Sequence, residues 1–151
     1  MRTMDWLNEL QEEALQNTLI TFLNQYGMKG LETALNYYES TQIDYICKTK
    51  SSIHKIKINT IYYLKIQTHT ISVYTQHGTY QKYGSLTEEQ ERLSTYGFIK
   101  CNQSCIVSLG KIRSICNNTI TLINNVQLHM SQHYAPKVLI AFSCYNVTKS
   151  I

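Results

Sequence analysis

The chain has 151 residues, of which 43% are hydrophobic and 16% are charged. This composition fits one globular domain with at most a small appendage, and it excludes an intrinsically disordered protein. The net charge is +4, a modest excess that excludes neither protein nor nucleic-acid partners. The longest apolar run, residues 138–142, is too short to span a bilayer, and residues 1–10 lack the pattern of a secretory signal, so we expect a cytoplasmic protein.

Residues 5–26 are predicted to form an amphipathic helix, because apolar residues recur there at every third or fourth position. Gly27 supplies a stop. A second, shorter helix is expected over residues 31–38. We expect residues 1–45 to form a helical N-terminal region that packs on the rest of the chain, mediates homodimerisation, or docks a regulatory protein partner.

The pattern changes after Thr41. Short segments rich in Ile, Val, Thr and Tyr alternate with the turn sequences "HG" and "NN", which predicts a β domain over residues 46–151. The fold class is therefore mainly β with a helical N-terminus. The expected strands lie within residues 52–58, 61–68, 70–76, 79–84, 104–109, 111–116, 119–123 and 126–131.

Two helices are expected within this β domain. Ser85, with Glu88 three residues later, forms a capping-box pattern before a short helix that Gly97 closes. A last helix is expected over Tyr134–Tyr145, with Pro136 in its first turn.

The segment "FIKCNQSCIVSLGKI", residues 98–112, has the composition of one strand but does not sort into an apolar and a polar face. Its first half is polar and its second half apolar. Asn102, Gln103 and Ser104 lie between two cysteines, so a polar group of side chains is expected at the end of a strand.

Motifs for catalysis are missing from the sequence. It contains no glycine-rich phosphate loop, no G-x-S-x-G and no H-E-x-x-H. Cys101 and Cys105 have no second Cys/His pair at zinc-site spacing, and a cysteine in a cytosolic β domain is more often a small buried hydrophobe than a nucleophile. We therefore expect neither an enzyme nor a bound cofactor or metal.

The charge is divided unevenly along the chain. Residues 1–50 contain four basic and seven acidic residues, a net charge of −3, whereas residues 51–151 contain ten basic and three acidic residues, a net charge of +7. Beyond Asp44 the acidic residues are confined to "TEEQE". This distribution is typical of a protein that binds nucleic acid, although lysine on solvated strand edges would also produce it.

The order of several motifs resembles the LytTR domain, the DNA-binding module of the AlgR/AgrA/LytR family of bacterial transcription regulators. The first block is an aromatic pair on a strand, followed by a polar loop with His69. The second block is a capped helix after "SL", then a Phe, a basic residue, a polar triplet ending in Ser, an aliphatic pair and a basic-Ile pair. The resemblance covers about residues 53–143, and the matching residues are Tyr62, Tyr63, His69, Ser85, Leu86, Phe98, Lys100, Asn102, Gln103, Ser104, Ile106, Val107, Lys111, Ile112 and the triplet ending at His133.

The resemblance implies an elongated stack of antiparallel β-sheets, with a short internal helix and a C-terminal helix, that binds specific duplex DNA through loops inserted in major grooves. By position in the family pattern, the expected base contacts are His69, Gln103 and His133. The expected DNA backbone contacts are Lys100, Asn102, Ser104 and Lys111. Asparagine and glutamine can pair bidentately with adenine, while lysines and hydroxyls hold phosphates.

Some positions depart from the family pattern. Gln103 and His133 replace residues that are commonly basic in the family, and Ser108 stands where Asn is frequent. An alternative is therefore a LytTR-fold protein-interaction module or anti-regulator that has lost DNA binding. Typical relatives also carry a receiver domain, and the roughly fifty residues upstream are too few for one.

Overall fold

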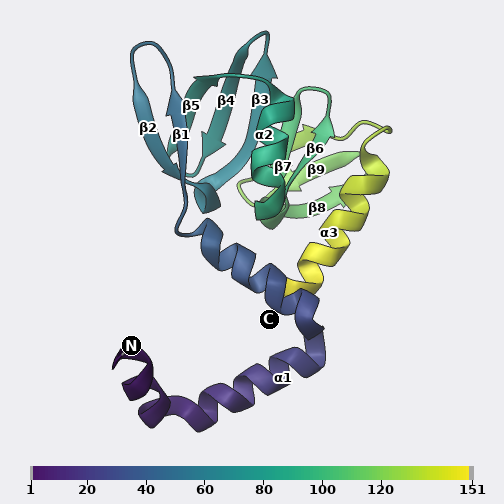
Figure 1. Cartoon of the computed structure of the whole chain (residues 1–151). Helices are drawn as coiled ribbons and strands as arrows, with labels where there is room; N and C mark the ends of the chain where they lie inside the picture. Colours follow the sequence, from purple (N-terminus) through teal and green to yellow (C-terminus); the bar gives the residue numbers. More distant parts are fainter. Residues whose placement is uncertain (1, 150–151) are drawn as a thin grey trace. The chain divides into compact units, whose positions relative to one another are not determined.

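The computed structural model describes the backbone of residues 2–149 and the side chains of residues 13–39 and 41–145. The chain divides into two compact units, residues 1–35 and 36–151. Figure 1 shows the helices and strands in chain order. Among the described residues, no helix combines the length and the hydropathy needed to cross a membrane.

The first helix is interrupted where the sequence predicts. α1 (Arg2–Ser40) contains a break at Gly27, whose φ of 70° and ψ of −171° are not helical. Glycine adopts this left-handed φ without the steric cost that a Cβ atom imposes. The predicted stop is confirmed, and the helical segments extend beyond the predicted ranges at both ends.

A two-stranded ribbon begins the β part of the chain. β1 (Asp44–Lys48) pairs antiparallel with β2 (Ile53–Lys57). Lys57 forms an ion pair with Asp44 at 2.9 Å, and its hydrogen bond holds the pKa of that carboxyl below its usual value. β1 was not among the expected strands, and the boundary placed between residues 45 and 46 falls inside it. Whether residues 1–45 and 46–151 have separate roles stays a prediction.

The largest sheet has five antiparallel strands in the order β5-β4-β3-β7-β6. Its first three strands form a meander, and β7 pairs with β3. Residues 98–112 are therefore not one strand but a hairpin followed by a short 3₁₀ turn, η3 (Leu109–Lys111). The strand bounds are β3 (Ile61–Gln67), β4 (Thr70–Thr75), β5 (Gly78–Tyr83), β6 (Phe98–Asn102) and β7 (Cys105–Ser108).

A three-stranded antiparallel sheet follows, with the order β10-β9-β8. Its strands are β8 (Ile112–Cys116), β9 (Thr119–Leu122) and β10 (Gln127–His129). Asn117 and Asn118 form the β8–β9 turn with φ values of 49° and 61°, as an "NN" hairpin requires. This mainly β architecture of antiparallel sheets with helices before, within and after them confirms the expected fold class.

The two helices of the β part are found where the sequence predicts them. α2 (Leu86–Leu93) starts after Ser85, whose hydroxyl accepts a hydrogen bond from the Glu88 backbone N–H at 3.2 Å. Gly97, with φ of 82°, ends the 3₁₀ turn η2 (Ser94–Tyr96) that follows. α3 (Ala135–Lys149) has Pro136 in its first turn and buries Val138.

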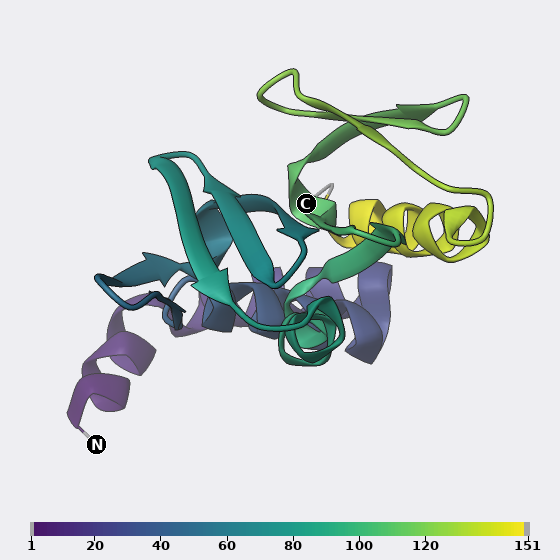
Figure 2. The ribbon, with the colours of Figure 1, turned by 90° about the horizontal axis from the view of Figure 1, so that it is seen from above.

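Two clusters of buried apolar side chains hold the β part together. One lies among β1, β2, β3, β4 and α2 and includes Leu64, Ile71 and Leu93. The other lies among β7, β8, β9, β10 and α3 and includes Ile120 and Val138. Figure 2 shows α3 as the yellow helix below the three-stranded sheet, and Val138 is the fully buried residue through which α3 joins the second cluster. The short elements are stabilised mainly by this shared burial.

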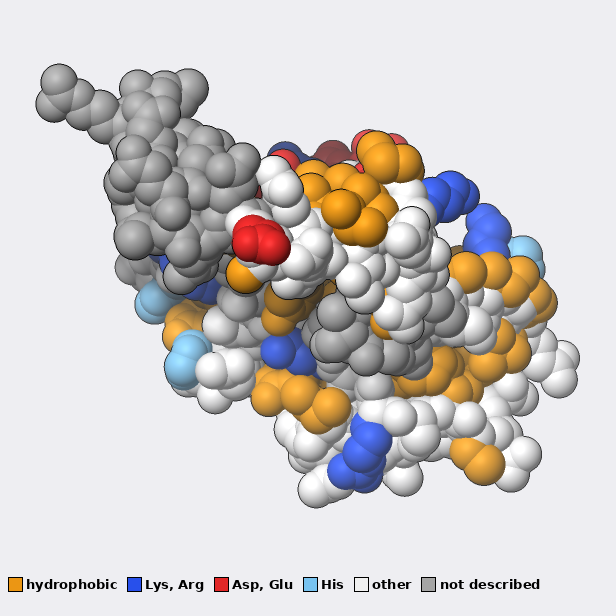
Figure 3. All heavy atoms as spheres, turned by 90° about the horizontal axis from the view of Figure 1, so that it is seen from below, with side chains coloured by type: hydrophobic (Ala, Val, Ile, Leu, Met, Phe, Trp, Pro, Cys, Tyr) orange, Lys and Arg blue, Asp and Glu red, His pale blue; other side chains and the backbone are white. Residues whose placement is uncertain are grey.

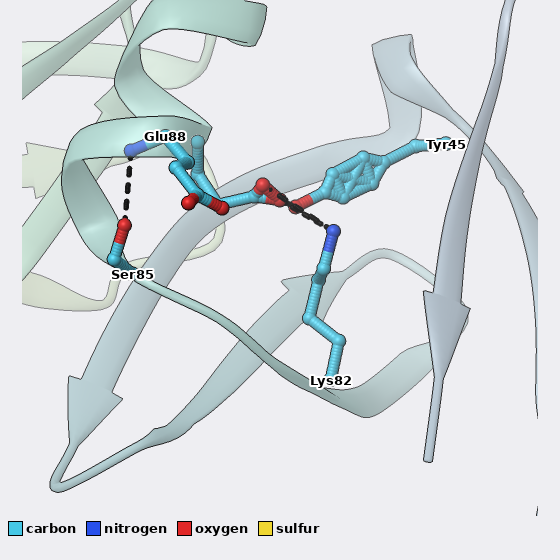
Figure 4. A network of polar contacts seen from close by, with 5 residues as sticks. Tyr45, Lys82, Ser85 and Glu88 are labelled. Atoms are coloured by element: carbon cyan, nitrogen blue, oxygen red, sulfur yellow. Dashed lines mark hydrogen bonds and ion pairs between the residues drawn. The ribbon is translucent and has the colours of Figure 1, made fainter.

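A buried polar network attaches α2 to the strands (Figure 4). The Tyr45 hydroxyl donates to Glu89 Oε1 at 2.6 Å, and Lys82 Nζ contacts Glu89 Oε1 and Oε2 at 2.5 and 3.3 Å. The Lys82 ammonium also lies 4.6 Å from the centre of the Tyr45 ring. Burial, together with the Glu89 carboxylate, raises the pKa of Tyr45 above its usual value, which keeps the hydroxyl a donor. The three side chains therefore join β1, β5 and α2.

Candidate nucleic-acid interface

The turn between β6 and β7 presents Gln103 to solvent. Asn102 shapes this turn, because its Oδ1 accepts hydrogen bonds from the Ser104 backbone N–H at 2.9 Å and from the Ser104 hydroxyl at 3.1 Å. Cys101 and Cys105 are completely buried beneath the turn. A hydrogen bond between the two thiols lowers the pKa of Cys101 and raises the pKa of Cys105. The polar residues at the tip of the turn thus rest on two buried cysteine side chains.

The β3–β4 turn lies beside the β6–β7 turn. The Ile66 backbone N–H, at the end of β3, donates to the Ser104 carbonyl at 2.9 Å. Two residues further on, Thr68 has φ of 60° and makes the tight turn that leaves His69 exposed. Both turns lie at the upper edge of the five-stranded sheet in Figure 1. His69 and Gln103 are therefore on the same edge.

The link between β10 and α3 brings His133 to the β6–β7 turn. The Ser131 backbone N–H donates to the Cys101 carbonyl at 3.0 Å, and Asn102 Nδ2 donates to the His129 carbonyl at 2.7 Å. His133 itself is exposed and packs edge-to-face on Tyr134, with ring centres 4.9 Å apart.

Tyr134 contacts both Lys100 and His133, and the sequence alone did not indicate this role. Lys100 Nζ lies 5.7 Å from the centre of the Tyr134 ring, and His133 packs on the same ring. A cation near an aromatic face gains a modest attraction, so the ring restrains the lysine without neutralising it. In the sequence, the signal for this role is the position of Tyr134 directly before α3, which has Pro136 in its first turn.

Lys111 does not join this group. It follows β7 at the end opposite to Gln103, and its Nζ lies 5.6 Å from the centre of the Tyr62 ring. The structure thus brings together Lys100, Asn102, Gln103, Ser104 and His133, places His69 on the adjacent turn, and leaves Lys111 apart. We call the surface formed by the side chains of His69, Lys100, Gln103 and His133 the turn surface.

The turn surface is free of carboxylates from its own elements. Between residues 45 and 145 the acidic residues are Glu88, Glu89 and Glu91, all in α2, and Glu89 is neutralised by Lys82. A half-buried lysine and two exposed histidines, on elements that carry no acidic residue, favour an anionic ligand. Figure 3 shows a different view, from below, in which hydrophobic and neutral side chains cover much of the surface. Among the described side chains, no group of three or more His, Cys, Asp or Glu could hold a metal ion.

Comparison with known proteins gives two findings. A family model described as the LytTr DNA-binding domain matches residues 51–142. A solved structure of the LytTr DNA-binding domain of a protein described as a methyl-accepting/DNA response regulator, from Bacillus cereus, superposes with a TM-score of 0.56 and 25% sequence identity. The match covers 64% of this chain and 95% of that chain. A comparison with curated proteins finds no match.

Proposed function

Because the chain belongs to the LytTR DNA-binding domain family, we propose that it regulates transcription in a bacterial cytoplasm by binding specific duplex DNA through the turn surface. The observation that carries the proposal is the assembly of Lys100, Gln103 and His133 by two hydrogen bonds that join β6 to β10 and to the link after it. His69 lies on the neighbouring turn. No catalytic step is part of the proposal.

The contact proposed for each residue follows from the chemistry of its side chain. Gln103, with an amide donor and acceptor, and the two histidines are proposed to contact base edges, where sequence is recognised. Lys100 is proposed to contact phosphate, which positions the protein without recognising sequence. Ser104 and Asn102 are proposed to lie near the same backbone, although their side chains already bond to each other.

Salt dependence tests the phosphate contact. Lys100→Ala should weaken binding to every duplex about equally and reduce the slope of log affinity against log salt concentration by about 0.9, because one counterion-releasing contact is lost. Lys29→Ala, which removes an exposed lysine outside the family-matched residues, is the control and should leave the slope unchanged. Fluorescence anisotropy at several salt concentrations measures both.

Lys111→Ala extends the same measurement. A reduced slope for this variant would show that the duplex continues to the other end of β7, and the pair of variants would map the contact surface. Unchanged slopes for both Lys100→Ala and Lys111→Ala would place the DNA-binding surface elsewhere. Absence of any duplex binding would favour the alternative, a LytTR-fold protein-interaction module or anti-regulator.

For the N-terminal helix we propose self-association with a second copy of the chain. Leu15 and Leu19 are 51% and 45% exposed, and with Phe22 and Tyr26 they follow the four-three-four spacing of a coiled-coil seam. Residues 14–28 contain no charged side chain, so two copies would meet there without repulsion. Helices in proteins gain most of their stability from packing an apolar face, and pairing would supply that packing.

Leu19→Glu should convert the self-associated full chain to a monomer, because two leucines in a symmetric pair lose burial worth on the order of 3 kcal/mol and like charges meet. Asn17→Glu adds the same charge about 200° around the helix and should leave the mass unchanged. Light scattering after size exclusion measures both. A monomeric parent protein would contradict the proposal and favour packing on the β domain or a regulatory protein partner.

A further inference from the structure

We propose that Asn102 is a positioning residue that fixes the β6–β7 turn relative to the β10–α3 link, so that Gln103 and His133 meet the duplex at a set separation. This inference rests on the proposed function, because it assigns the geometry of the same surface. It gives Asn102 a different main role from the phosphate contact expected from the family pattern.

One half of the Asn102 amide holds its own turn. Oδ1 accepts from the Ser104 backbone N–H and from the Ser104 hydroxyl, at 2.9 and 3.1 Å. This is the local arrangement by which asparagine stabilises turns. Because Gln103 lies between these two residues, the bonds determine the direction in which its side chain leaves the sheet.

The other half of the amide reaches a different sheet. Nδ2 donates to the carbonyl of His129, the last residue of β10, at 2.7 Å. β6 belongs to the five-stranded sheet and β10 to the three-stranded sheet, and the two sheets share no ladder. The bond from the Ser131 N–H to the Cys101 carbonyl, at 3.0 Å, lies next to it. Two hydrogen bonds thus connect the β6–β7 turn, which carries Gln103, to the segment that carries His133. Asn102 supplies the one that involves a side chain.

A side chain at position 102 must be an amide to donate to the His129 carbonyl and accept from the Ser104 N–H at the same time. A backbone N–H can only donate and a carbonyl can only accept, so the two partners fix which end of the amide faces each of them. Aspartate would lack the donor for His129, and serine would be too short to reach it while still able to accept from Ser104. Serine therefore separates the two functions of the side chain without adding charge.

The test uses the full chain and a duplex selected from a random pool by the parent protein, with a random duplex of equal length for comparison. Asn102→Ser should lower affinity for the selected duplex by about three- to tenfold, as the loss of one hydrogen bond allows, and should change affinity for the random duplex and the salt slope little. Asn102→Ala, which removes both sets of bonds, should lose more. Gln127→Ala removes an exposed amide from β10 and is the control, with no expected change.

A mutant cycle distinguishes positioning from direct contact. In a Gln103→Ala/His133→Ala background, Asn102→Ser should cost no further affinity, because the side chains that it positions are gone. Equal losses on selected and random duplexes would instead identify a phosphate contact and overturn the proposal. If the parent protein prefers the selected duplex and Asn102→Ser keeps that preference unchanged, the positioning role of Asn102 is overturned and the proposed function stands. A parent protein without duplex preference would overturn the proposed function and, with it, the role of Asn102 in reading sequence.

Discussion

Replacing Glu89 with alanine is expected to lower the free energy of unfolding by about 3–5 kcal/mol, because it leaves the Lys82 ammonium buried without its counter-ion. Both side chains are almost fully buried, at 11% and 3% exposure. The Tyr45 hydroxyl loses its acceptor in the same variant. Urea denaturation followed by circular dichroism measures the change.

Two further variants separate the buried charge from the helix itself. Glu91→Ala removes an exposed carboxylate from the same helix and should change stability by no more than about 0.5 kcal/mol. The double variant Lys82→Met/Glu89→Leu should be more stable than Glu89→Ala, since no unpaired charge remains. If Glu89→Ala costs no more than Glu91→Ala, the network does not stabilise the fold.

Replacing His133, Gln103 or His69 with alanine is expected to cost about 1–3 kcal/mol of binding free energy at a selected duplex and much less on random duplex, because only the contact with a base edge is lost. Preference should relax at the base pairs that each side chain contacts. Competition titrations with single-base variants of the selected duplex measure this. Equal losses on both duplexes would contradict the assignment of these residues as base contacts.

Local structure was predictable wherever one short segment contains its own signal. The break at Gly27, the Ser85 cap and the "NN" turn each depend on residues within a few positions of one another, and all three are confirmed. β1 was missed because Asp44–Lys48 is short and begins soon after α1 ends at Ser40. The irregular pattern of residues 98–112 was recognised, but its explanation, a hairpin, depends on pairing that a single segment does not specify.

The long-range polar contacts were not predictable from the sequence in the same way. Glu89 lies in the acidic "TEEQE" segment and resembles its exposed neighbours, although its spacing of three and four residues from Leu86 and Leu93 places it on the buried face. Asn102 was expected to contact phosphate, and its bond to His129 joins residues 27 positions apart. The grouping of Lys100 and His133 around Tyr134 likewise depends on how two sheets meet.

The ribbon of β1 and β2 has a consequence for how copies of the protein behave at high concentration. Each strand has one hydrogen-bonded neighbour among the described strands, and Ile46 and Ile53 are 43% and 64% exposed. A bare apolar strand edge of this kind invites pairing with the same edge of another molecule. Lys55, in the middle of β2, is exposed and places a positive charge along that edge, so two identical ribbons repel one another. The ribbon thus carries its own protection against strand-to-strand polymerisation.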